Sequence, residues 1–285
     1  MQPGMKSEDK RAVVMEESIV KNDIQAVIFD VDGTLYDYKT HSVLPSTAES
    51  LRRLKEQQIK IIVASGRSYA LLGMDLIRLA DPDYFVLVNG HEVLGQNGTP
   101  MRLIQLTASQ TEKIERIASQ QSIHMMLKYH SYSYIYSGWD EMISVFGQTQ
   151  LDLSLFRNCP ARDHHFQELP LGITLKGAED LRDRLRGLGE ELRVEYFHDP
   201  SECDVFLRSV NKWSGLCEVF RQTGIRPEQC IAFGDGGNDT DMLRAVGCGV
   251  AMGNACKEAK AAAKHICGPS WEDGIYRFLR DQAVL

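Results

Sequence analysis

Four short apolar runs stand out along the chain, and each of them ends in small, polar or acidic residues. They span residues 26–29, 59–64, 84–88 and 230–233. Apolar runs of this length, bounded by turn-forming residues, are typical of strands buried on both faces of a sheet. Helical patterns separate the first three runs, and this alternation predicts right-handed parallel crossovers. The sequence therefore predicts an α/β fold with a doubly wound parallel sheet.

The helical patterns of this α/β region have recognisable ends. Ser46, with Glu49 three residues later, has the form of a capping box, which predicts a helix that continues to about residue 57. The other elements expected here, in chain order, are a helix that ends at residue 80, a helix over 212–223, a helix that ends near 246, a strand over 248–252 and two closing helices.

The middle of the chain has a different pattern. Asn97-Gly98 is a hairpin signal between two extended stretches, and Thr107 with Gln110 begins an amphipathic helix that runs to about residue 121. Shorter pieces follow: strand-like stretches at 125–136, 172–176, 192–197 and 204–207, and helical patterns at 140–148 and 178–188. We therefore expect an α+β domain over 105–206, inserted into a core made of 23–104 and 207–285, with residues 1–22 as a tail.

Composition and charge limit the classes of function. The 285 residues carry a formal net charge of −7, which argues against a broad surface for nucleic acid or acidic membranes but leaves a local basic pocket possible. No apolar stretch approaches the ~20 residues that span a bilayer, and the N-terminus lacks the form of a signal peptide. The 7 cysteines have no metal-type spacing, which fits buried thiols in a reducing cytoplasm. We expect a cytoplasmic monomer or small homo-oligomer.

Two carboxylates follow the first apolar run. In an extended segment the side chains of Asp30 and Asp32 point the same way, so both are expected to project beyond the edge of the sheet. Two carboxylates held this close repel each other unless they share a cation or one of them is protonated. The arrangement suits a hard divalent metal, with one carboxylate as nucleophile and the other as proton shuttle.

The other runs bring further polar groups to the same edge, because the carboxyl ends of parallel strands lie together. The set comprises Ser65 and Gly66, Asn89 and Gly90, and Asp235, Asn238 and Asp239, with Lys212 expected nearby. Carboxylates alone indicate a cation. Carboxylates combined with a hydroxyl, free backbone amides and an ammonium group indicate a cation together with a phosphate.

Alternatives to this interpretation are weaker. The Asp-x-Asp-Gly segment could be a surface turn, but a buried-strand pattern precedes it directly. The loop over 234–239 lacks the spacing of an EF-hand, and neither a dinucleotide-binding glycine motif nor a Walker motif is present. The tyrosines near residue 130 could stack on a substrate ring or could pack on a half-buried sheet, and the sequence leaves both open.

Taken together, the motifs resemble those of a known family. The ordered segments Asp30-Val31-Asp32-Gly33-Thr34, Ser65-Gly66-Arg67, Lys212 and Gly234-Asp235-Gly236-Gly237-Asn238-Asp239 are similar to the four motifs of the haloacid dehalogenase (HAD) superfamily. Asn89-Gly90, the segment over 250–255 and the insert resemble Cof-type phosphatases with a class IIB cap. Two residues depart from the family pattern: Trp213 replaces a glycine, and His91 replaces an alanine.

The resemblance implies a HAD-like Rossmannoid core, a magnesium ion and a role for each motif residue. Asp30 would be the nucleophile and form an aspartyl-phosphate, and Asp32 would act as general acid and then as general base. Mg²⁺ would be held by Asp30, the Asp32 backbone carbonyl and Asp235, while Asp239 would orient the water ligands of the metal. The phosphoryl oxygens would be bound by Ser65, the Gly66 amide, Asn238 and Lys212.

The function implied is a magnesium-dependent phosphatase that hydrolyses small phosphorylated metabolites, most of all sugar phosphates, under a lid formed by the insert. Two alternatives stay open: a phosphotransferase or phosphomutase on the same fold, and a non-catalytic sensor of a phosphorylated ligand. His91 is expected to reach the substrate, and Trp213 is expected to reshape the helix that carries Lys212.

Overall fold

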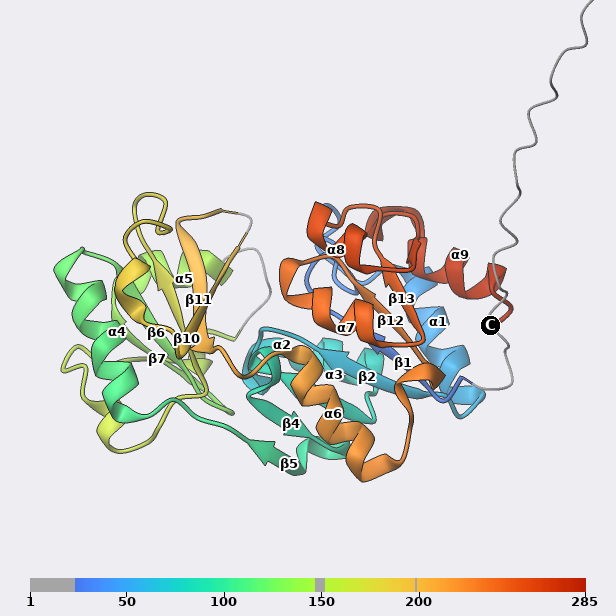
Figure 1. The fold of residues 1–285 in the computed structure, drawn as a ribbon, viewed down its shortest axis with the longest axis horizontal. Helices are drawn as coiled ribbons and strands as arrows, with labels where there is room; N and C mark the ends of the chain where they lie inside the picture. The colour runs from blue at the N-terminus through green and yellow to red at the C-terminus, as the bar shows by residue number, and fades with distance from the viewer. Residues whose placement is uncertain (1–23, 147–151, 198) are drawn as a thin grey trace, which may run out of the picture.

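The chain folds around two separate β-sheets (Figure 1). The computed structural model describes residues 24–146, 152–197 and 199–285, so the expected tail over 1–22 lies outside the described residues. One sheet has 8 strands in the order β14-β13-β12-β1-β2-β3-β4-β5, and the other has 6 in the order β10-β11-β9-β6-β7-β8. We call the first sheet with its helices the core, and the second with helices α4 and α5 the cap.

The four apolar runs form the centre of the core sheet, as predicted. They are β1 (Ala26–Phe29), β2 (Lys60–Ala64), β3 (Tyr84–Leu87) and β12 (Cys230–Gly234), which pair in parallel in the order β12-β1-β2-β3. Most of their side chains are fully buried, and the rings of Phe29 and Phe233 stack at 5.5 Å between neighbouring strands. The predicted strand β13 (Cys248–Ala251) extends this sheet, and a short strand that the sequence did not predict, β14 (His265–Ile266), closes it.

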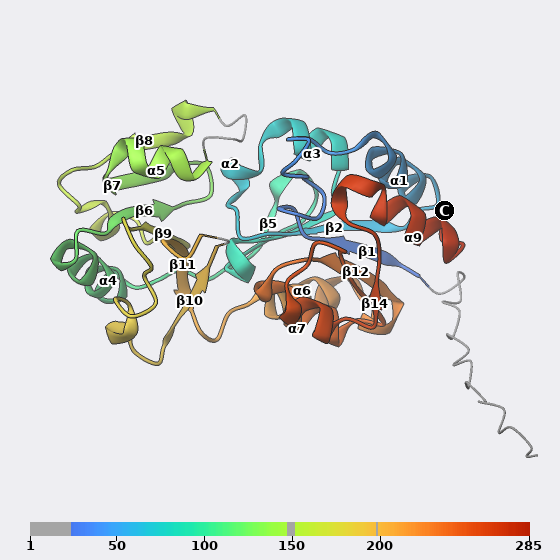
Figure 2. The same cartoon turned by 90° about the horizontal axis from the view of Figure 1, so that it is seen from above.

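Helices cover both faces of the core sheet, with α1 and α3 on one face and α6 and α7 on the other (Figure 2). The core helices are α1 (Pro45–Glu56), α2 (Tyr69–Leu72), α3 (Met74–Ala80), α6 (Lys212–Thr223), α7 (Thr240–Ala245), α8 (Lys257–Ala262) and α9 (Gly274–Asp281). Among the described residues, none of the helices has both the length and the apolar character of a membrane span.

Two details of the predicted core helices are wrong. Ser46 does not cap α1: the helix begins at Pro45, whose fixed φ suits the first helical position, and the Ser46 hydroxyl donates to Asp273 instead. The helix expected to run unbroken to residue 80 is divided into α2 and α3 at Gly73, where φ is +81°. Because an α-helix needs negative φ throughout, the chain turns at this glycine.

The hairpin predicted at Asn97-Gly98 forms at the other edge of the core sheet. It joins β4 (Glu92–Leu94) to β5 (Pro100–Leu103), and the two strands pair in antiparallel fashion. From there the chain crosses to the cap and begins α4 (Ala108–Gln120), where Thr107 and Gln110 form the predicted capping box.

The cap is an antiparallel sheet with one parallel edge pair. Its strands are β6 (His124–Lys128), β7 (Ser133–Ser137), β8 (Phe156–Asn158), β9 (Gly172–Lys176), β10 (Leu192–Tyr196) and β11 (Glu202–Leu207). The strand-like stretch at 125–136 is a hairpin of β6 and β7. The helical pattern at 140–148 forms α5 (Trp139–Phe146), and its last two residues lie outside the described residues. The domain boundaries at 105 and 206 stay a prediction.

The helix predicted over 178–188 does not form. The chain makes turns there and ends in a single 3₁₀ turn at Arg186–Leu188. The side chains whose spacing suggested a helix are nevertheless buried: Leu181, Leu185 and Leu188. The Asp180 carboxylate accepts a hydrogen bond from the backbone N–H of Arg182 at 2.9 Å, and Gly189 adopts φ +94°. Such local side-chain bonds and glycines compete with helix formation, whereas turns still bury the leucines.

The two faces of the cap sheet differ in chemistry. Alternate residues of its strands pack with α4 in an apolar cluster, for example Leu192 and Val194 of β10 and Cys203 and Val205 of β11. The intervening residues include Arg193, Glu195 and Asp204, which lie on the opposite, polar face. The cap and core also share apolar contacts, since the buried Leu71 of α2 belongs to a cluster with four cap residues: Met126, Ile135, Met142 and Phe156.

Candidate active site

A buried lysine and two carboxylates lie at the carboxyl edge of the core sheet. Lys212, the first residue of α6, has no exposed surface, and its Nζ lies 2.6 Å from Asp30 Oδ1 and 2.7 Å from Asp239 Oδ1. Asn211 caps this helix and accepts a hydrogen bond from the backbone N–H of Ser214, which fixes where the lysine starts. Burial opposes the charge of Lys212, but Asp239 and Asp30 outweigh it and raise the pKa of the lysine. Lys212 is therefore a permanent cation in this site.

Three carboxylates crowd around that single cation. Oxygens of Asp30, Asp235 and Asp239 all lie within 4.8 Å of one another. Burial and the neighbouring carboxylates raise the pKa of Asp30 to about 7 and that of Asp235 to about 9, although Lys212 opposes both shifts. These shifts mean that the ionised carboxylates lack sufficient positive charge nearby: with all three ionised, Lys212 balances only one of them. An oxygen-rich site of this kind fits a hard divalent cation such as Mg²⁺. Of the residues that the sequence analysis chose for the metal, Asp30 and Asp235 are thus brought together, with Asp239 beside them.

Gly33 makes room for this cluster. Its φ is +83°, and a Cβ atom at this position would lie 2.3 Å from Asp235 Oδ2. The carboxylate of Asp235 also accepts hydrogen bonds from Thr34 Oγ1 at 3.1 Å and from Asn254 Nδ2 at 3.4 Å. Thr34 and Asn254 both stand in segments that resemble motifs of the family, but the sequence analysis chose neither of them as a site residue. Each has a hydrogen-bonding side chain inside a motif, and this feature could have identified them as site residues.

Asp239 is held on both of its oxygens. Oδ1 contacts Lys212, while Oδ2 accepts hydrogen bonds from the backbone N–H groups of Asp235 and Gly236 at 3.0 and 2.9 Å. A carboxylate with both oxygens occupied is suited to fixing the loop that carries Asp235 rather than to binding the metal as a principal ligand. The role predicted for Asp239, as a residue that supports the metal site indirectly, agrees with this geometry and stays a prediction.

Asp32 does not join the carboxylate cluster. The strand ends at Phe29, so alternation along a strand does not by itself align Asp32 with Asp30. The two carboxylates are still close enough for the charge of Asp32 to raise the pKa of Asp30, and their projection to the same side stays a prediction. Arg67 Nε and Nη2 contact the two oxygens of Asp32 at 2.8 and 2.5 Å. Burial raises the pKa of Asp32, but the charge and hydrogen bonds of Arg67 outweigh burial and hold that pKa below its ordinary value. Sequence reasoning missed Arg67 as a partner, although it stands in the second motif.

The predicted phosphate-binding groups gather around Asn89. Asn238 Nδ2 donates to Asn89 Oδ1 at 2.9 Å, and a Cβ atom on Gly66 would lie 3.3 Å from Asn89 Nδ2. The backbone at Val88 and Asn89 has φ +46° and +53°, which is a strained conformation for a β-branched residue. Ser65 Oγ accepts a hydrogen bond from the Arg67 N–H at 3.1 Å, so its own proton is free to be donated. The strained segment thus lies beside Gly66 and Asn238, and their role in binding phosphate stays a prediction.

The two residues that depart from the family pattern, His91 and Trp213, are buried and partly buried. His91 is fully buried and ties together the two connections between core and cap: Nδ1 lies 2.8 Å from the Ile104 carbonyl, and Nε2 accepts from the Leu207 N–H at 3.2 Å. The expectation that His91 reaches the substrate is wrong. Trp213 packs against the core, 5.9 Å from the ring of Phe220, and α6 forms from Lys212 onward. An effect of Trp213 on the shape of this helix stays a prediction.

The cap contributes a buried ion pair that touches the Ser65-Gly66 loop of the core. Lys128 Nζ lies 2.7 Å from both oxygens of Asp204, and it also donates to the Gly66 carbonyl at 3.1 Å. The Thr174 hydroxyl donates to Asp204 Oδ1 at 2.8 Å. The three donors of the ammonium group are thus satisfied, and one of them crosses from the cap to the second motif of the core.

The tyrosines of the cap pack among themselves. The rings of Tyr129 and Tyr132 stack at 5.3 Å, and Tyr134 contacts His164 with a ring separation of 3.9 Å. These side chains belong to the apolar cluster under α4, which is the face of the sheet opposite to Lys128. Of the two readings that the sequence left open, the structure supports packing on a half-buried sheet.

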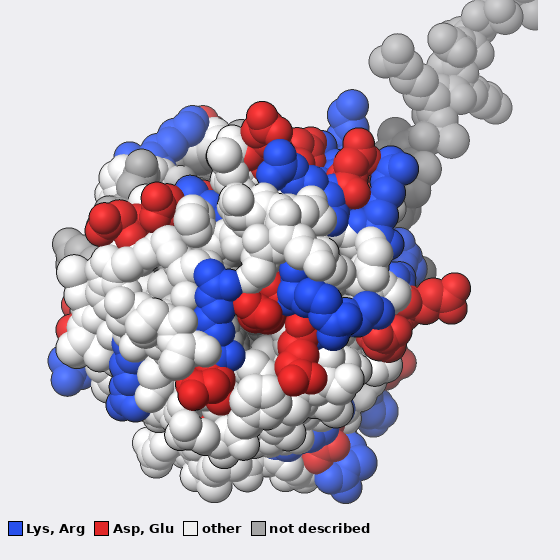
Figure 3. All heavy atoms as spheres, turned by 90° about the vertical axis from the view of Figure 1, so that its left-hand side faces the viewer, with Lys and Arg blue, Asp and Glu red and all other residues white. Residues whose placement is uncertain are grey.

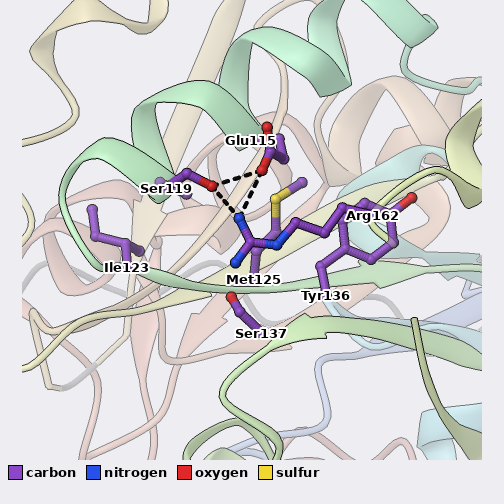
Figure 4. Close-up of a pocket in the computed structure, with 8 residues that line it drawn as sticks. Glu115, Ser119, Ile123, Met125, Tyr136, Ser137 and Arg162 are labelled. Atoms are coloured by element: carbon purple, nitrogen blue, oxygen red, sulfur yellow. Dashed lines mark hydrogen bonds and ion pairs between the residues drawn. The ribbon is translucent and has the colours of Figure 1, made fainter. Parts of the chain in front are cut away.

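Two hollows in the structure differ in their relation to the candidate site. A small cavity below α4, where Arg162 bridges Glu115 and Ser119 (Figure 4), has no room for a water molecule and contains none of the predicted site residues. A larger cleft of about 700 Å³ lies between β10 of the cap and the starts of α6 and α7 in the core, where Asn211 and Asp241 line it. The lining of the cleft also lacks the predicted site residues, but it includes Asn211, which directly precedes Lys212 in the chain.

Comparisons with known proteins agree with this geometry. A family model described as haloacid dehalogenase-like hydrolase matches residues 27–279. A putative phosphatase of Mycoplasma pneumoniae is 28% identical to this chain in an alignment of 287 positions that covers 92% of this chain and 98% of that protein. An HMP-PP phosphatase of Serratia proteamaculans is 29% identical and covers 82% of this chain and 85% of its own length.

Solved structures show the same fold. The HAD subclass IIB sugar phosphatase BT4131 superposes with a TM-score of 0.81 at 24% identity, and the match covers 92% of this chain and 100% of that one. The phosphatase BT1666 of Bacteroides thetaiotaomicron superposes with a TM-score of 0.80 at 24% identity, covering 92% and 96%. The predicted doubly wound core with an additional cap is thereby confirmed.

Proposed function

Because this chain belongs to the haloacid dehalogenase-like hydrolase family, we propose that it is a magnesium-dependent phosphatase of small phosphorylated metabolites that works through an aspartyl-phosphate on Asp30. The observation that carries the proposal is the buried group of three carboxylates around Lys212, at the same sheet edge as the Ser65-Gly66 loop. Two of the proteins named above, the HMP-PP phosphatase and the sugar phosphatase BT4131, are named for small-molecule substrates, which supports this class of substrate.

In the first step Asp30 attacks the phosphorus atom, so that a bond from its carboxylate oxygen to phosphorus forms while the bond to the leaving oxygen breaks. Lys212 lies 2.6 Å from this carboxylate and holds it in position while offsetting the negative charge of the phosphoryl group. Asp32 gives a proton to the departing alkoxide. Held by the carboxylates of Asp30 and Asp235 and the backbone carbonyl of Asp32, Mg²⁺ would neutralise further charge on the transferring oxygens.

In the second step Asp32 takes a proton from water, the water oxygen attacks phosphorus, and inorganic phosphate leaves Asp30. The two steps ask for opposite protonation states of Asp32. Its pairing with Arg67 favours the ionised carboxylate, which is the form required of a base. For the first step the Asp32 side chain has to leave Arg67 so that it can carry a proton, and its side chain is 30% exposed, which leaves room for that movement.

The test is phosphate release from p-nitrophenyl phosphate and from a panel of phosphorylated metabolites, with Mg²⁺ and with EDTA. We expect turnover that requires Mg²⁺ and disappears in Asp30→Asn, while the circular dichroism spectrum of that variant stays that of the wild type. Turnover by Asp30→Asn at the wild-type rate would remove Asp30 as nucleophile. Phosphate captured by an added sugar acceptor, at the expense of free phosphate, would favour a phosphotransferase instead.

Three further expectations go with this proposal. All 7 cysteines are free thiols, which is compatible with the cytoplasmic location predicted from the sequence. At the end of the cap shown in Figure 3, basic and acidic side chains are interspersed rather than gathered by sign, in keeping with a small-molecule substrate rather than nucleic acid. The oligomeric state stays a prediction.

A further inference from the structure

The polar face of the cap sheet is the surface that meets the phosphate-binding edge of the core. Lys128 of this face contacts the Gly66 carbonyl, and Glu195 Oε1 lies 3.0 Å from where a Cβ atom on Gly237 would be. Gly66 and Gly237 belong to two different motifs of the candidate site. The Glu195 carboxylate is also close enough to Lys212 and Asp239 to interact with their charges. The side chains of this face therefore lie where the leaving group of a phosphorylated substrate would extend from Asp30.

Two ion pairs on this face differ in how far they are available to a ligand. The Lys128–Asp204 pair is buried, with 3% and 7% of its side chains exposed, and its donors are fully used within the protein. The Arg193–Glu195 pair is joined by one contact of 2.8 Å, from Nη2 to Oε2, and its side chains are 26% and 21% exposed. A guanidinium has five donor N–H groups and a carboxylate accepts several hydrogen bonds, so this pair retains unused capacity on both sides.

The Arg193–Glu195 pair also lines the cleft of about 700 Å³, together with Asn211 of the core. This volume lies within the range of about 300–1,000 Å³ typical of small-molecule sites. Adjacent acceptor and donor groups of opposite charge match hydroxyl groups, because each hydroxyl both donates and accepts a hydrogen bond. Since Glu195 offsets the charge of Arg193, the pair offers little net attraction for an anion.

The outer arginines of the cleft do not change that balance. Arg182 and Arg186 are paired with Asp180 and Asp183, at 2.8 and 2.6 Å. Arg208 donates to the backbone carbonyl oxygens of Glu190 and Leu192. The carbonyl oxygens leave the charge of Arg208 in place, but the lining also contains the carboxylate of Asp241. The positive and negative side chains of the lining and of these partners are thus close to balance, which favours a neutral polar group over a second phosphate.

We propose that Arg193 and Glu195 form the subsite that binds the hydroxyl groups of the leaving group, so that the substrate is a phosphorylated polyol or sugar. This inference rests on the proposed phosphatase function and adds the residues that select its substrate. Glu195 accepts hydrogen bonds from substrate hydroxyls, and Arg193 donates to their oxygens. Lys128 and Asp204 do not contact the substrate in this arrangement but hold the cap against the Gly66 loop.

The test compares substrates with and without hydroxyl groups on similar carbon chains. Initial rates with Mg²⁺ give kcat/KM for n-hexyl phosphate and for the best hydrolysed of sorbitol-6-phosphate, glucose-6-phosphate and ribose-5-phosphate. Hydrogen bonds to charged groups contribute enough that we expect the wild type to prefer the hydroxylated substrate by at least about 10-fold. Glu195→Gln and Arg193→Met should each reduce that preference at least about 5-fold, with n-hexyl phosphate affected less than about 2-fold.

The control is Glu191→Gln, which makes the same chemical change at a half-exposed side chain that is paired with Lys113 outside the cleft. It should leave both substrates unchanged, and thermal unfolding should show all variants folded. Equal losses on both substrates, or no loss on either, would overturn the subsite while leaving the phosphatase function intact. The subsite would also be overturned if the wild type preferred fructose-1,6-bisphosphate over these monophosphates and Arg193→Met abolished that preference. No hydrolysis of any phosphate by the wild type would instead refute the proposed function.

Discussion

The buried Lys128–Asp204 pair yields a prediction in which a second substitution repairs the damage of the first. Replacing Lys128 by Met removes the ammonium group and leaves the Asp204 carboxylate, 7% exposed, with the Thr174 hydroxyl as its remaining described partner. Removing one member of a buried ion pair typically costs about 3–5 kcal/mol, because the other charge is left without compensation. We therefore expect Lys128→Met to lower the free energy of unfolding by about that amount.

Adding Asp204→Asn to Lys128→Met removes the orphaned charge with almost no change of shape. The amide oxygen of Asn still accepts the hydrogen bond that Thr174 donates over 2.8 Å in the wild type. We expect the double variant to recover at least about 2 kcal/mol relative to Lys128→Met alone, because the cost of burying an uncompensated charge disappears. The Gly66 carbonyl, 3.1 Å from Lys128 Nζ, stays without that donor, so kcat of the double variant should remain about 5-fold below the wild type.

The assay is urea-induced unfolding followed by fluorescence, in which Trp139 of α5 reports on the cap. Lys113→Met serves as the control, since Lys113 and Glu191 are 3.4 Å apart with 38% and 49% of their side chains exposed. A surface pair of this kind should contribute less than about 1 kcal/mol. The reasoning is refuted if Asp204→Asn destabilises the Lys128→Met variant further, because the buried charge would then not be the cause of the loss.

The other predictions concern the metal site, the nucleophile and the connection between core and cap. In Gly33→Ala the new methyl group would lie 2.3 Å from Asp235 Oδ2, so Mg²⁺ should be needed at a concentration at least about 10-fold higher for activity and should no longer raise the melting temperature. Gly73→Ala is its control, because φ there is also positive, at +81°, while a Cβ atom at this position would have no heavy atom within 4 Å apart from its chain neighbours. A similar loss of Mg²⁺ response in Gly73→Ala would assign the effect to backbone strain. Asp30→Asn should release no phosphate yet still unfold cooperatively, and residual turnover that depends on Mg²⁺ would count against the aspartyl-phosphate. Burial lowers the pKa of His91 from 6.5 to about 4, so the unfolded chain takes up a proton that the native protein does not between these values. The free energy of unfolding should thus fall as the pH decreases through this window. Between pH 7.5 and pH 5 the fall in the wild type should exceed that in His91→Gln by about 2 kcal/mol. The prediction is refuted if urea titrations show the same dependence of unfolding free energy on pH for both proteins.

Much of the core was predictable because its signals are local. A run such as Val27-Ile28-Phe29 can only be buried, and the turn residues after it mark the strand end. The capping box at Thr107 was readable for the same reason, since its partners are three residues apart. At Ser46 the same pattern misled, because a preceding proline had already fixed the first turn of the helix.

The candidate site likewise has a part that could be predicted from the sequence and a part that could not. Parallel pairing of the predicted strands was enough to bring Asp30 and Asp235 to one edge, whereas Lys212, which begins a helix, was assigned to the site by the resemblance to the HAD motifs. Their contacts with segments far along the chain were not readable. Arg67 as the partner of Asp32 depends on how the chain turns after β2, and no pattern of residue types specifies that turn.

What the sequence by itself determined is the alternation of strands and helices, the strand ends and the carboxylates they carry, because each depends on neighbouring residues. Only the tertiary structure decided that His91 joins the two connections to the cap, that Lys128 reaches Gly66, and that Arg193 and Glu195 face the cleft. These contacts depend on which face of the cap sheet meets the core. That choice is made by the packing of apolar clusters from distant segments, and a change of one residue in register would reverse it.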